Sequence, residues 1–511
     1  MELIKRYGNI IIIICIILEM LIWPSINNFF GCLMTVISWI IFSRIGLKEQ
    51  VIREHIFAWL VFLSMSLYRI LPLIATLLEG RSIGYNFLVP LSTYCGETLL
   101  YLISALAFYL AIIRKKTLPS LKFILQKCGF YDPINNKTLW ILGIIGLIFK
   151  IYTTINYIEY GNILGKTLAG FTFLQYAPIL IFFPNLMGNK QDNKVLVFNI
   201  TCVIYIVLLV VFSFATNQRM AMLEPIGTFA LLLLLSFINS SKTTRKTINR
   251  KFIIQGFVIA IFIIPIVNDI SLAMLYNRRF RTNTNRKELL FKTIETLSDK
   301  DRMEQLRSLK EKMEKKAVAN EMSKTWSETY VSNFALNRYC NLKITDNTLY
   351  HARKVGFPNE QMTAAFWLDV AAIFPTPLLR FFGIDYDKND GYSRGDRLKA
   401  LSANRHPFFS LLVTSHLADG LLVFGYWYFL IEFILFYIRF LFLDTFILNN
   451  NGKIRYSIFG LVTIFSFLAM FQHAGGGCDS LGYLLRWYWQ DIILFLLGIT
   501  LIKKILSLVA S

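Results

Sequence analysis

FIIQGFVIAIFIIPIVNDISL, residues 252–272, is followed directly by AMLYNRRFR, residues 273–281, and this boundary organises the whole chain. The first string has the length and composition that cross about 30 Å of hydrocarbon as an α-helix. The second string opens a polar, charged and aromatic insert that extends to Ser415. Long apolar segments lie on both sides of the insert, so the pattern is typical of a membrane protein with one large hydrophilic segment.

The composition of the 511-residue chain agrees, because 55% of its residues are hydrophobic and 44 are Phe. Backbone groups in lipid must be hydrogen-bonded within their own segment, so we expect the apolar segments to be helices. The first segment lacks a small-residue cleavage site and is predicted to be a membrane helix, not a signal peptide. We predict an all-α polytopic membrane protein. About twelve transmembrane helices are expected, near residues 5–23, 29–45, 56–78, 91–113, 138–155, 168–187, 195–213, 220–238, 252–272, 416–443, 456–473 and 484–502.

Lys and Arg residues alternate between rich and poor connections, and this bias predicts the orientation. With the N-terminus in the cytoplasm, the short outside loops hold only Arg81, Lys166 and Arg219. Both termini are then cytoplasmic and the insert is extracytoplasmic. The net charge of +21 is explained by cytoplasmic anchors and not by nucleic acid. We predict three parts: a membrane domain over 1–272, an outer loop over 273–415, and a membrane domain over 416–511.

The insert is expected to be mostly helical. Amphipathic helices are predicted from Lys287 to Lys324 with a break near Ser298–Asp299, and further helices over 327–341 and 359–374. Pro375 and Pro377 should end the last of these. The apolar stripes of these helices need a partner surface, so we expect the insert to pack on the membrane part instead of folding alone.

Ionisable residues inside apolar spans are costly and are candidates for function. Most of them lie in the outer half of their predicted spans. This placement suggests a polar cavity that is open to the outside. The alternative is that these residues pair with one another or extend to the membrane interface. They are Glu19, Arg69, Glu97, Lys150, Glu224, Asp269, Asp419 and Asp491, with Glu432 nearer the middle.

Three short segments are predicted at the same outer face. Arg219 follows the seventh span in a tight loop, where it is placed to bind a phosphate with both arms of its guanidinium or to anchor the interface. His416 and Asp419 are three residues apart and share one helical face, as an acid/base pair or a satisfied interfacial pair would. His473 begins a Gly-rich run to Asp479, followed by Arg486, and such a run can bring backbone N–H groups close to an anion.

Several of these positions resemble motifs of the Wzy-type O-antigen and oligosaccharide repeat-unit polymerase family, over roughly residues 200–490. The matching residues are Gln218-Arg219, Asn337-Arg338-Tyr339, Ile373-Phe374-Pro375 with Arg380, Tyr386-Asp387, and Ser415-His416, Asp419 and Phe424-Gly425. Two positions depart from the family pattern. Gln218 replaces a small residue, and Asp419 stands where the family has Glu.

The resemblance implies a glycosyltransferase of the bacterial inner membrane. Such enzymes transfer a glycan from undecaprenyl diphosphate to the next lipid-linked repeat unit on the outer face, for polysaccharides such as lipopolysaccharide O-antigen or capsule. The implied partners are these lipid-linked substrates, the bilayer and a chain-length regulator. Nucleic acid is not an expected partner.

The residue types fit this chemistry. A leaving diphosphate needs fixed cations, and an attacking sugar hydroxyl needs a base, for which Asp419 or His416 is the candidate. The predicted substrate-binding residues are Arg219, Arg278, Arg279, Arg281, Arg338, His473 and Arg486. The seven cysteines show no metal-ligand spacing, and we predict neither a metal nor a cofactor.

Two alternative functions remain open at this stage. One is an outer-face glycan ligase, and the other is a transporter or flippase of lipid-linked oligosaccharide. No repeat relates the two halves of the chain, which disfavours a transporter built from internal repeats. The sugar repeat and the linkage formed are not encoded in any motif that we identify.

Overall fold

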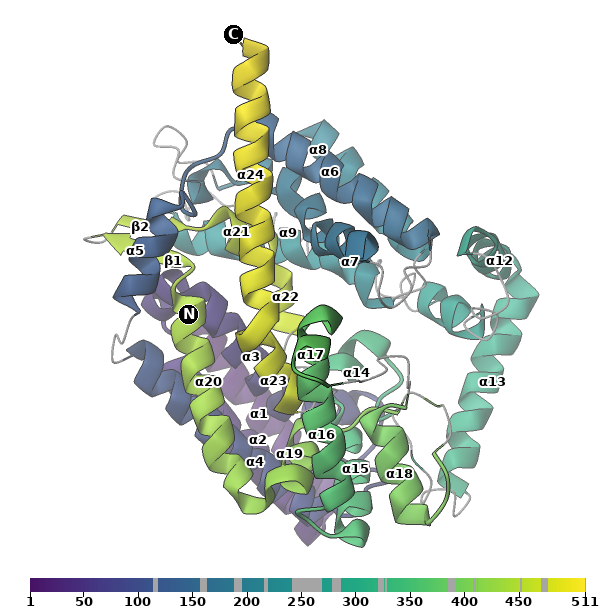
Figure 1. The fold of residues 1–511 in the computed structure, drawn as a ribbon. Helices are drawn as coiled ribbons and strands as arrows, with labels where there is room; N and C mark the ends of the chain where they lie inside the picture. Colours follow the sequence, from purple (N-terminus) through teal and green to yellow (C-terminus); the bar gives the residue numbers. More distant parts are fainter. Residues whose placement is uncertain are drawn as a thin grey trace. The chain divides into compact units, whose positions relative to one another are not determined.

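The chain is mostly helical in the structure, a computed structural model (Figure 1). It describes residues 1–113, 118–156, 163–187, 195–215, 219–240, 269–277, 286–319, 326, 329–384, 392–407, 410, 412–450, 453–469 and 477–510. Among these residues the only sheet is a two-stranded antiparallel hairpin of β1 (Ile447–Asn450) and β2 (Lys453–Tyr456). The prediction of a predominantly α-helical protein is therefore confirmed.

The contacts divide the chain into two compact units. Unit 1 consists of residues 1–119, 320–445 and 467–489, and unit 2 of residues 120–319, 446–466 and 490–511. The insert 273–415 contributes to both units, so it does not form a compact unit of its own. The predicted division into parts 1–272, 273–415 and 416–511 separates membrane segments from an outer loop. Contacts within the protein do not test this division, and it stays a prediction.

Unit 1 contains the N-terminal helices, the second part of the insert and the helices that follow it. Its elements are α1 (Glu2–Ile22), α2 (Ile26–Ile45), α3 (Glu49–Leu78), α4 (Pro90–Phe108), η1 (Tyr109–Ile113), α14 (Phe334–Cys340), α15 (Leu342–Val355), α16 (Glu360–Ile373), α17 (Thr376–Phe381), α18 (Arg394–Ala403), α19 (His416–Phe424), η6 (Gly425–Trp427), α20 (Tyr428–Asp444), α23 (Gly477–Gly482) and η7 (Tyr483–Trp487).

Unit 2 contains the middle helices and the hairpin. Its elements are α5 (Pro119–Lys127), α6 (Asn136–Ile155), α7 (Ile163–Gly170), η2 (Thr172–Phe182), η3 (Pro184–Leu186), α8 (Ile200–Ala215), α9 (Arg219–Asn239), α12 (Arg286–Ser298), α13 (Lys300–Ala319), β1, β2 and α21 (Ile458–Val462). Helices α22 (Ile464–Ala469) and α24 (Tyr488–Ala510) have residues assigned to each unit.

Six helical segments in the described part of the chain are long and apolar enough to cross a membrane. They are Ile26–Ile45, Glu49–Leu78, Pro90–Ile113, Asn136–Thr154, Ala221–Asn239 and His416–Asp444. Each corresponds to one of the twelve predicted spans. These helices support a membrane-embedded protein, whereas the remaining spans, the membrane type and the orientation stay predictions.

The predicted span 168–187 differs from a regular membrane helix. It forms α7 only as far as Gly170 and then the 3₁₀ helices η2 and η3. Pro178 lies inside η2 and has no N–H to donate. The backbone of η2 also approaches α6 closely, because a Cβ placed on Gly146 would lie 2.2 Å from the backbone N of Gln175. Span 195–213 is represented by the shorter apolar helix Ile200–Ser213, and most of 252–272 lies outside the described residues.

The insert helices begin and end close to the predicted signals. Helices α12 and α13 are separated at Asp299, as the predicted break requires, and α16 ends at Ile373, before Pro375. The helix expected over 327–341 is wrong, since α14 covers only Phe334–Cys340 and a second helix, α15, follows at once. Helix α15 is buried over most of its length although many of its residues, including Lys343, Asp346 and His351, are polar, so its composition does not indicate its burial.

Side chains of α3 and α4 hold the insert through hydrogen bonds within unit 1. The hydroxyl of Tyr68 donates to the backbone oxygen of Asn341 at 2.7 Å, and the hydroxyl of Thr345 donates to Oε1 of Glu97 at 2.7 Å. Asp346 accepts hydrogen bonds from the backbone N–H groups of Leu88 and Val89, at distances of 2.7–2.9 Å. The expectation that the insert packs on the apolar helices is confirmed for this part of the chain.

Candidate functional site

Helix α19 carries both residues that the sequence predicts as acid or base, and its start is fixed by its cap. Ser415 precedes the helix, and its Oγ accepts a hydrogen bond from the backbone N of Ala418 at 3.2 Å. The same hydroxyl lies 2.8 Å from Oγ1 of Thr348 on α15. Side-chain oxygens of Ser at this position satisfy an N–H group that the helix leaves unpaired. The insert thus sets where α19 begins.

Asp419 is fully buried and faces α18. Nε of Arg394, the first residue of α18, donates a hydrogen bond to Oδ1 of Asp419 at 2.5 Å. Oδ2 of Asp419 has no hydrogen-bond partner among the described residues. The guanidinium thus contacts one oxygen of the Asp419 side chain, and the other oxygen makes no hydrogen bond to a described residue.

Arg394 is otherwise held by weak contacts. Its Nη1 lies 3.5 Å from Oδ2 of Asp369 on α16, and both terminal nitrogens lie 3.5 Å from the backbone oxygen of Met362. Its guanidinium also lies over the ring of Phe366, at 5.4 Å from the centroid. Burial raises the pKa of Asp369, although the charge of Arg394 opposes this shift. The terminal nitrogens of Arg394 are therefore the less tightly bound half of the side chain.

His416 lies on the same helix but faces other partners. Its side chain is buried, and Nδ1 lies 2.9 Å from the hydroxyl of Tyr428. The same nitrogen is 3.5 Å from Oε1 of Glu432 on α20. His416 and Asp419 are therefore not hydrogen-bonded as a pair, and each belongs to a separate set of contacts.

Glu432 and Arg439 form the deepest charged part of the cluster, both on α20 and both buried. The hydroxyls of Tyr428 and Ser480 face the carboxyl group of Glu432. Neither carboxyl oxygen accepts a hydrogen bond of ordinary geometry from a described residue. Nε of Arg439 donates to the hydroxyl of Tyr488 at 3.3 Å. Nη2 of Arg439 also has no hydrogen-bond partner among the described residues.

The third predicted segment reaches the same cluster through α23 and η7. Burial, together with the charge of Asp419, raises the pKa of Asp479 to about 6. Nη1 of Arg486 donates to the backbone oxygen of Ile373, at the end of α16, at 2.6 Å. Helices α16, α19 and α23 lie side by side in unit 1 (Figure 1). The structure therefore brings the predicted segments around His416–Asp419 and Asp479–Arg486 together.

The remaining predicted site residues are placed differently. Arg338 lies half-buried in α14, which packs on α3. Arg219 is the first residue of α9 in unit 2, and its side chain lies outside the described residues. Arg278, Arg279, Arg281 and His473 also lie outside the described residues. Their predicted roles in binding stay predictions.

Most of the ionisable residues predicted in spans have partners of their own. Arg69 and Glu97 form a buried ion pair at 2.6 Å. Asp269 pairs with Arg307 at 2.6 Å. Glu19 accepts a hydrogen bond from the backbone N of Ile83 at 2.9 Å, and Glu224 accepts one from Tyr176. The alternative that these groups pair therefore holds for several of them, including Asp419, which pairs with Arg394.

Three residues of the site were missed in the sequence. Arg439 lies inside the predicted span 416–443, so the rule that ionisable residues in spans are candidates would have identified it. Arg394 and Asp369 lie in the insert, where charged residues are common, and no local signal separates them from solvated ones. Only their packing against α19 identifies them.

No protein-family model, curated protein or solved structure matches the chain. The geometry of the cluster is therefore what indicates its chemistry. A carboxylate oxygen without a hydrogen-bond partner can accept a proton, and a guanidinium with loosely held terminal nitrogens can bind an oxyanion. Asp419 lies near the start of the apolar segment His416–Asp444, and Arg394 begins helix α18 of the insert.

Proposed function

We propose that this protein is a membrane glycosyltransferase of the bacterial inner membrane that polymerises lipid-linked oligosaccharide repeat units. The glycan moves from undecaprenyl diphosphate to the next lipid-linked unit on the outer face. The observation that supports this most directly is the buried pairing of Asp419 with Arg394. The pairing supplies the two groups that glycan transfer from a diphosphate requires, a base and a cation.

The proposed step assigns each of these groups a separate role. The attacking sugar hydroxyl forms a bond to the anomeric carbon of the donor and gives its proton to the free Oδ2 of Asp419. The bond between the anomeric carbon and the diphosphate oxygen breaks, and the diphosphate leaves with the electron pair. The terminal nitrogens of Arg394 stabilise the negative charge that develops there.

Asp419 is favoured over His416 as the base. Asp419 has one oxygen in contact with the Arg394 cation and one oxygen without a hydrogen-bond partner among the described residues. His416 is already in contact with Tyr428 and Glu432 through Nδ1. We assign His416 to positioning the start of α19 against α20.

The test is Asp419→Asn in cells whose long-chain glycan depends on this protein. Asn keeps the volume of Asp and removes the base, so single repeat units should replace long chains at normal protein level. Asp132→Asn is the matched control, because Asp132 is exposed and lies on a loop of unit 2. Normal long chains in Asp419→Asn cells would contradict the proposal.

The same cells separate the two alternative functions. Loss of a ligase would leave long chains on the lipid carrier, without transfer to their final acceptor. Loss of a flippase would leave repeat units on the cytoplasmic face. Only loss of a polymerase leaves single repeat units on the outer face.

A further inference from the structure

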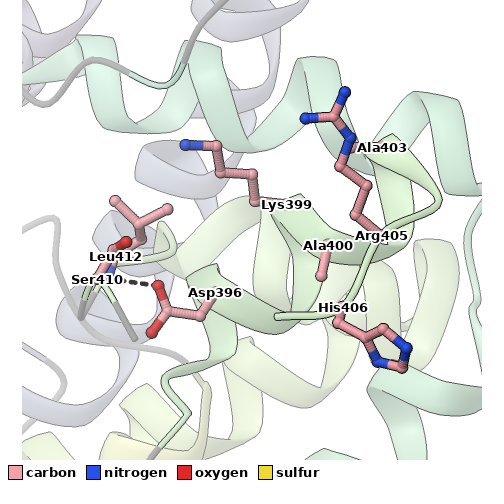
Figure 2. Close-up of a pocket in the computed structure, with 8 residues that line it drawn as sticks. All are labelled: Asp396, Lys399, Ala400, Ala403, Arg405, His406, Ser410 and Leu412. Atoms are coloured by element: carbon pink, nitrogen blue, oxygen red, sulfur yellow. Dashed lines mark hydrogen bonds between the residues drawn. The ribbon is translucent and has the colours of Figure 1, made fainter. Parts of the chain in front are cut away.

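A pocket with a volume of about 190 Å³ lies beside α18, outside the cluster around Asp419 (Figure 2). Its lining includes Lys399 and Ala400 of α18, Arg405 and His406 after the helix, and Ser410. All of these residues belong to unit 1 and to the insert that we predict on the outer face. Neither the motifs nor the proposed reaction assigns a role to this pocket.

The cations of the pocket are available for a ligand. The side chains of Lys399 and Arg405 form neither a hydrogen bond nor an ion pair with any residue that the structure describes. In Figure 2 the side chain of Lys399 points up and to the left and that of Arg405 points up, whereas His406 points down. Two cations whose charges are not used within the protein are the groups that bind carboxylate or phosphate.

The one carboxylate in the lining is already occupied. Asp396 is buried, and its Oδ1 accepts a hydrogen bond from the backbone N of Leu412 at 3.2 Å, drawn in Figure 2. Its Oδ2 accepts from the backbone N of Ser393 at 3.2 Å, as the second half of a capping box. Asp396 thus holds the helix start and the following loop together, and it does not neutralise Lys399 or Arg405 by pairing.

A neighbouring histidine lies close enough to feel the positive charge here. His351 of α15 is buried, and its Nδ1 lies 2.6 Å from Oγ of Ser402 on α18. Burial, followed by the charges of Lys354 and Lys399, lowers the pKa of His351 to about 4. An excess of positive charge therefore extends across this side of α15 and α18.

The size of the pocket limits what it can hold. A volume of 190 Å³ is that of about six water molecules, at about 30 Å³ each. It is below the roughly 300–1,000 Å³ that is typical of sites for larger ligands. Lys399 follows Arg394 by five residues, or about 7.5 Å of helix rise. The pocket therefore suits one small charged group near the reacting end of a longer molecule.

We propose that this pocket binds the carboxylate of an acidic sugar in the glycan, through Lys399 and Arg405. The inference rests on the proposed function, because it identifies one class of substrate for the same enzyme. Repeat units that contain a hexuronic acid are the expected substrates. The pocket would then fix the position of the glycan relative to Arg394 and Asp419 by holding a charge on a nearby sugar.

The experiment measures sugar binding by the full-length protein in nanodiscs of phosphatidylcholine. Glucuronate is the acidic probe and glucose is the neutral one, both titrated by saturation-transfer NMR. Glucuronate should bind and glucose should not. Lys399→Gln and Arg405→Gln should each weaken glucuronate binding at least tenfold. Lys354→Gln is the matched control, since it removes the same charge nearby from a side chain that does not line the pocket.

Several results would overturn the inference. These are equal binding of glucose, unchanged glucuronate binding in Lys399→Gln and Arg405→Gln, or an equal loss in Lys354→Gln. Inorganic phosphate is the third probe, and tight phosphate binding without glucuronate binding would replace the acidic sugar with a phosphate group. The thermal unfolding of each variant checks that it is folded.

The outcomes also separate this inference from the proposed function. Asp419→Asn should abolish polymerisation and leave glucuronate binding unchanged. If glucuronate fails to bind while Asp419→Asn still loses long chains, only the acidic-sugar site is wrong. If glucuronate binds but Asp419→Asn makes normal long chains, the polymerase is wrong and the binding site remains.

Discussion

Nε of Arg394 donates a hydrogen bond to Oδ1 of Asp419 at 2.5 Å. The two residues are 25 positions apart in the sequence and lie on different helices. One helix lies in the insert and the other starts the apolar segment His416–Asp444. The contact ties the insert to the buried carboxylate that we propose as the base. Replacing Arg394 leaves Asp419 buried without its cation, which is destabilising, so the activity of such variants is compared at equal amounts of folded protein.

Arg394→Ala should lower the rate of glycan transfer by about 100- to 1,000-fold, the usual effect of removing one preorganised donor. Arg394→Lys should recover only part of this rate, because Lys cannot hold Asp419 and a phosphate with one planar group. The measurement is glycan chain length in cells and transfer rate in proteoliposomes. Arg455→Ala, on the exposed side of β2, is the control. A near-normal rate in Arg394→Ala would remove Arg394 from the reaction.

Arg219 provides a second test of the diphosphate site. An interfacial anchor needs only length and charge, so Arg219→Lys would then have little effect. A bidentate phosphate contact needs the planar guanidinium, and its loss should cost on the order of 2–4 kcal/mol, or about 30- to 1,000-fold in rate. Cells with Arg219→Lys or Arg219→Ala should display single repeat units. Long chains in Arg219→Ala cells would exclude a role for Arg219 in binding.

The buried ion pair of Arg69 and Glu97 should determine stability. Both side chains are almost fully buried, and Glu97 also accepts a hydrogen bond from Thr345 of the insert. Arg69→Met leaves an unpaired buried carboxylate, which should cost about 3–5 kcal/mol of the free energy of unfolding. The double variant Arg69→Met/Glu97→Gln should recover much of this loss. Thermal unfolding in detergent measures both, with Lys5→Met, which removes a partly exposed ion pair with Glu2, as control.

His351 should make the stability of the insert depend on pH. Its pKa is lowered to about 4 in the folded chain, from an ordinary value of 6.5. The unfolded chain therefore binds more protons between these values, so stability is greatest above pH 6.5 and falls as the pH falls toward 4. The loss is at most roughly 3 kcal/mol. His351→Gln should remove this part of the pH dependence of thermal unfolding, whereas His406→Gln should retain it.

The orientation of the chain is tested by labelling single cysteines with an impermeant thiol reagent in intact spheroplasts. Cysteines at Asn283 or Asn389 should react, because the distribution of Lys and Arg predicts the insert outside. Both positions lie outside the described residues. The exposed Cys95 and Cys128 must first be replaced. A cysteine at Lys122 should react only after lysis, and the reverse pattern would show that the predicted topology is inverted.

Local signals in the sequence determined much of the helical structure. The break at Asp299 and the end of α16 before Pro375 follow from the polarity and backbone limits of a few adjacent residues. Six apolar spans were also predictable, because lipid requires long uninterrupted helices. The 3₁₀ conformation around Pro178 was not predictable, because it depends on close packing against α6 at Gly146.

The sequence by itself identified His416, Asp419 and Arg486 as candidates, because charged and polar residues in apolar segments are costly and usually functional. Only the tertiary structure decided their partners. Asp419 pairs with Arg394 from the insert, whereas His416 contacts Tyr428 and Glu432. The physical reason is that an ion pair between distant residues depends on how the helices pack, and the local sequence pattern does not determine that packing.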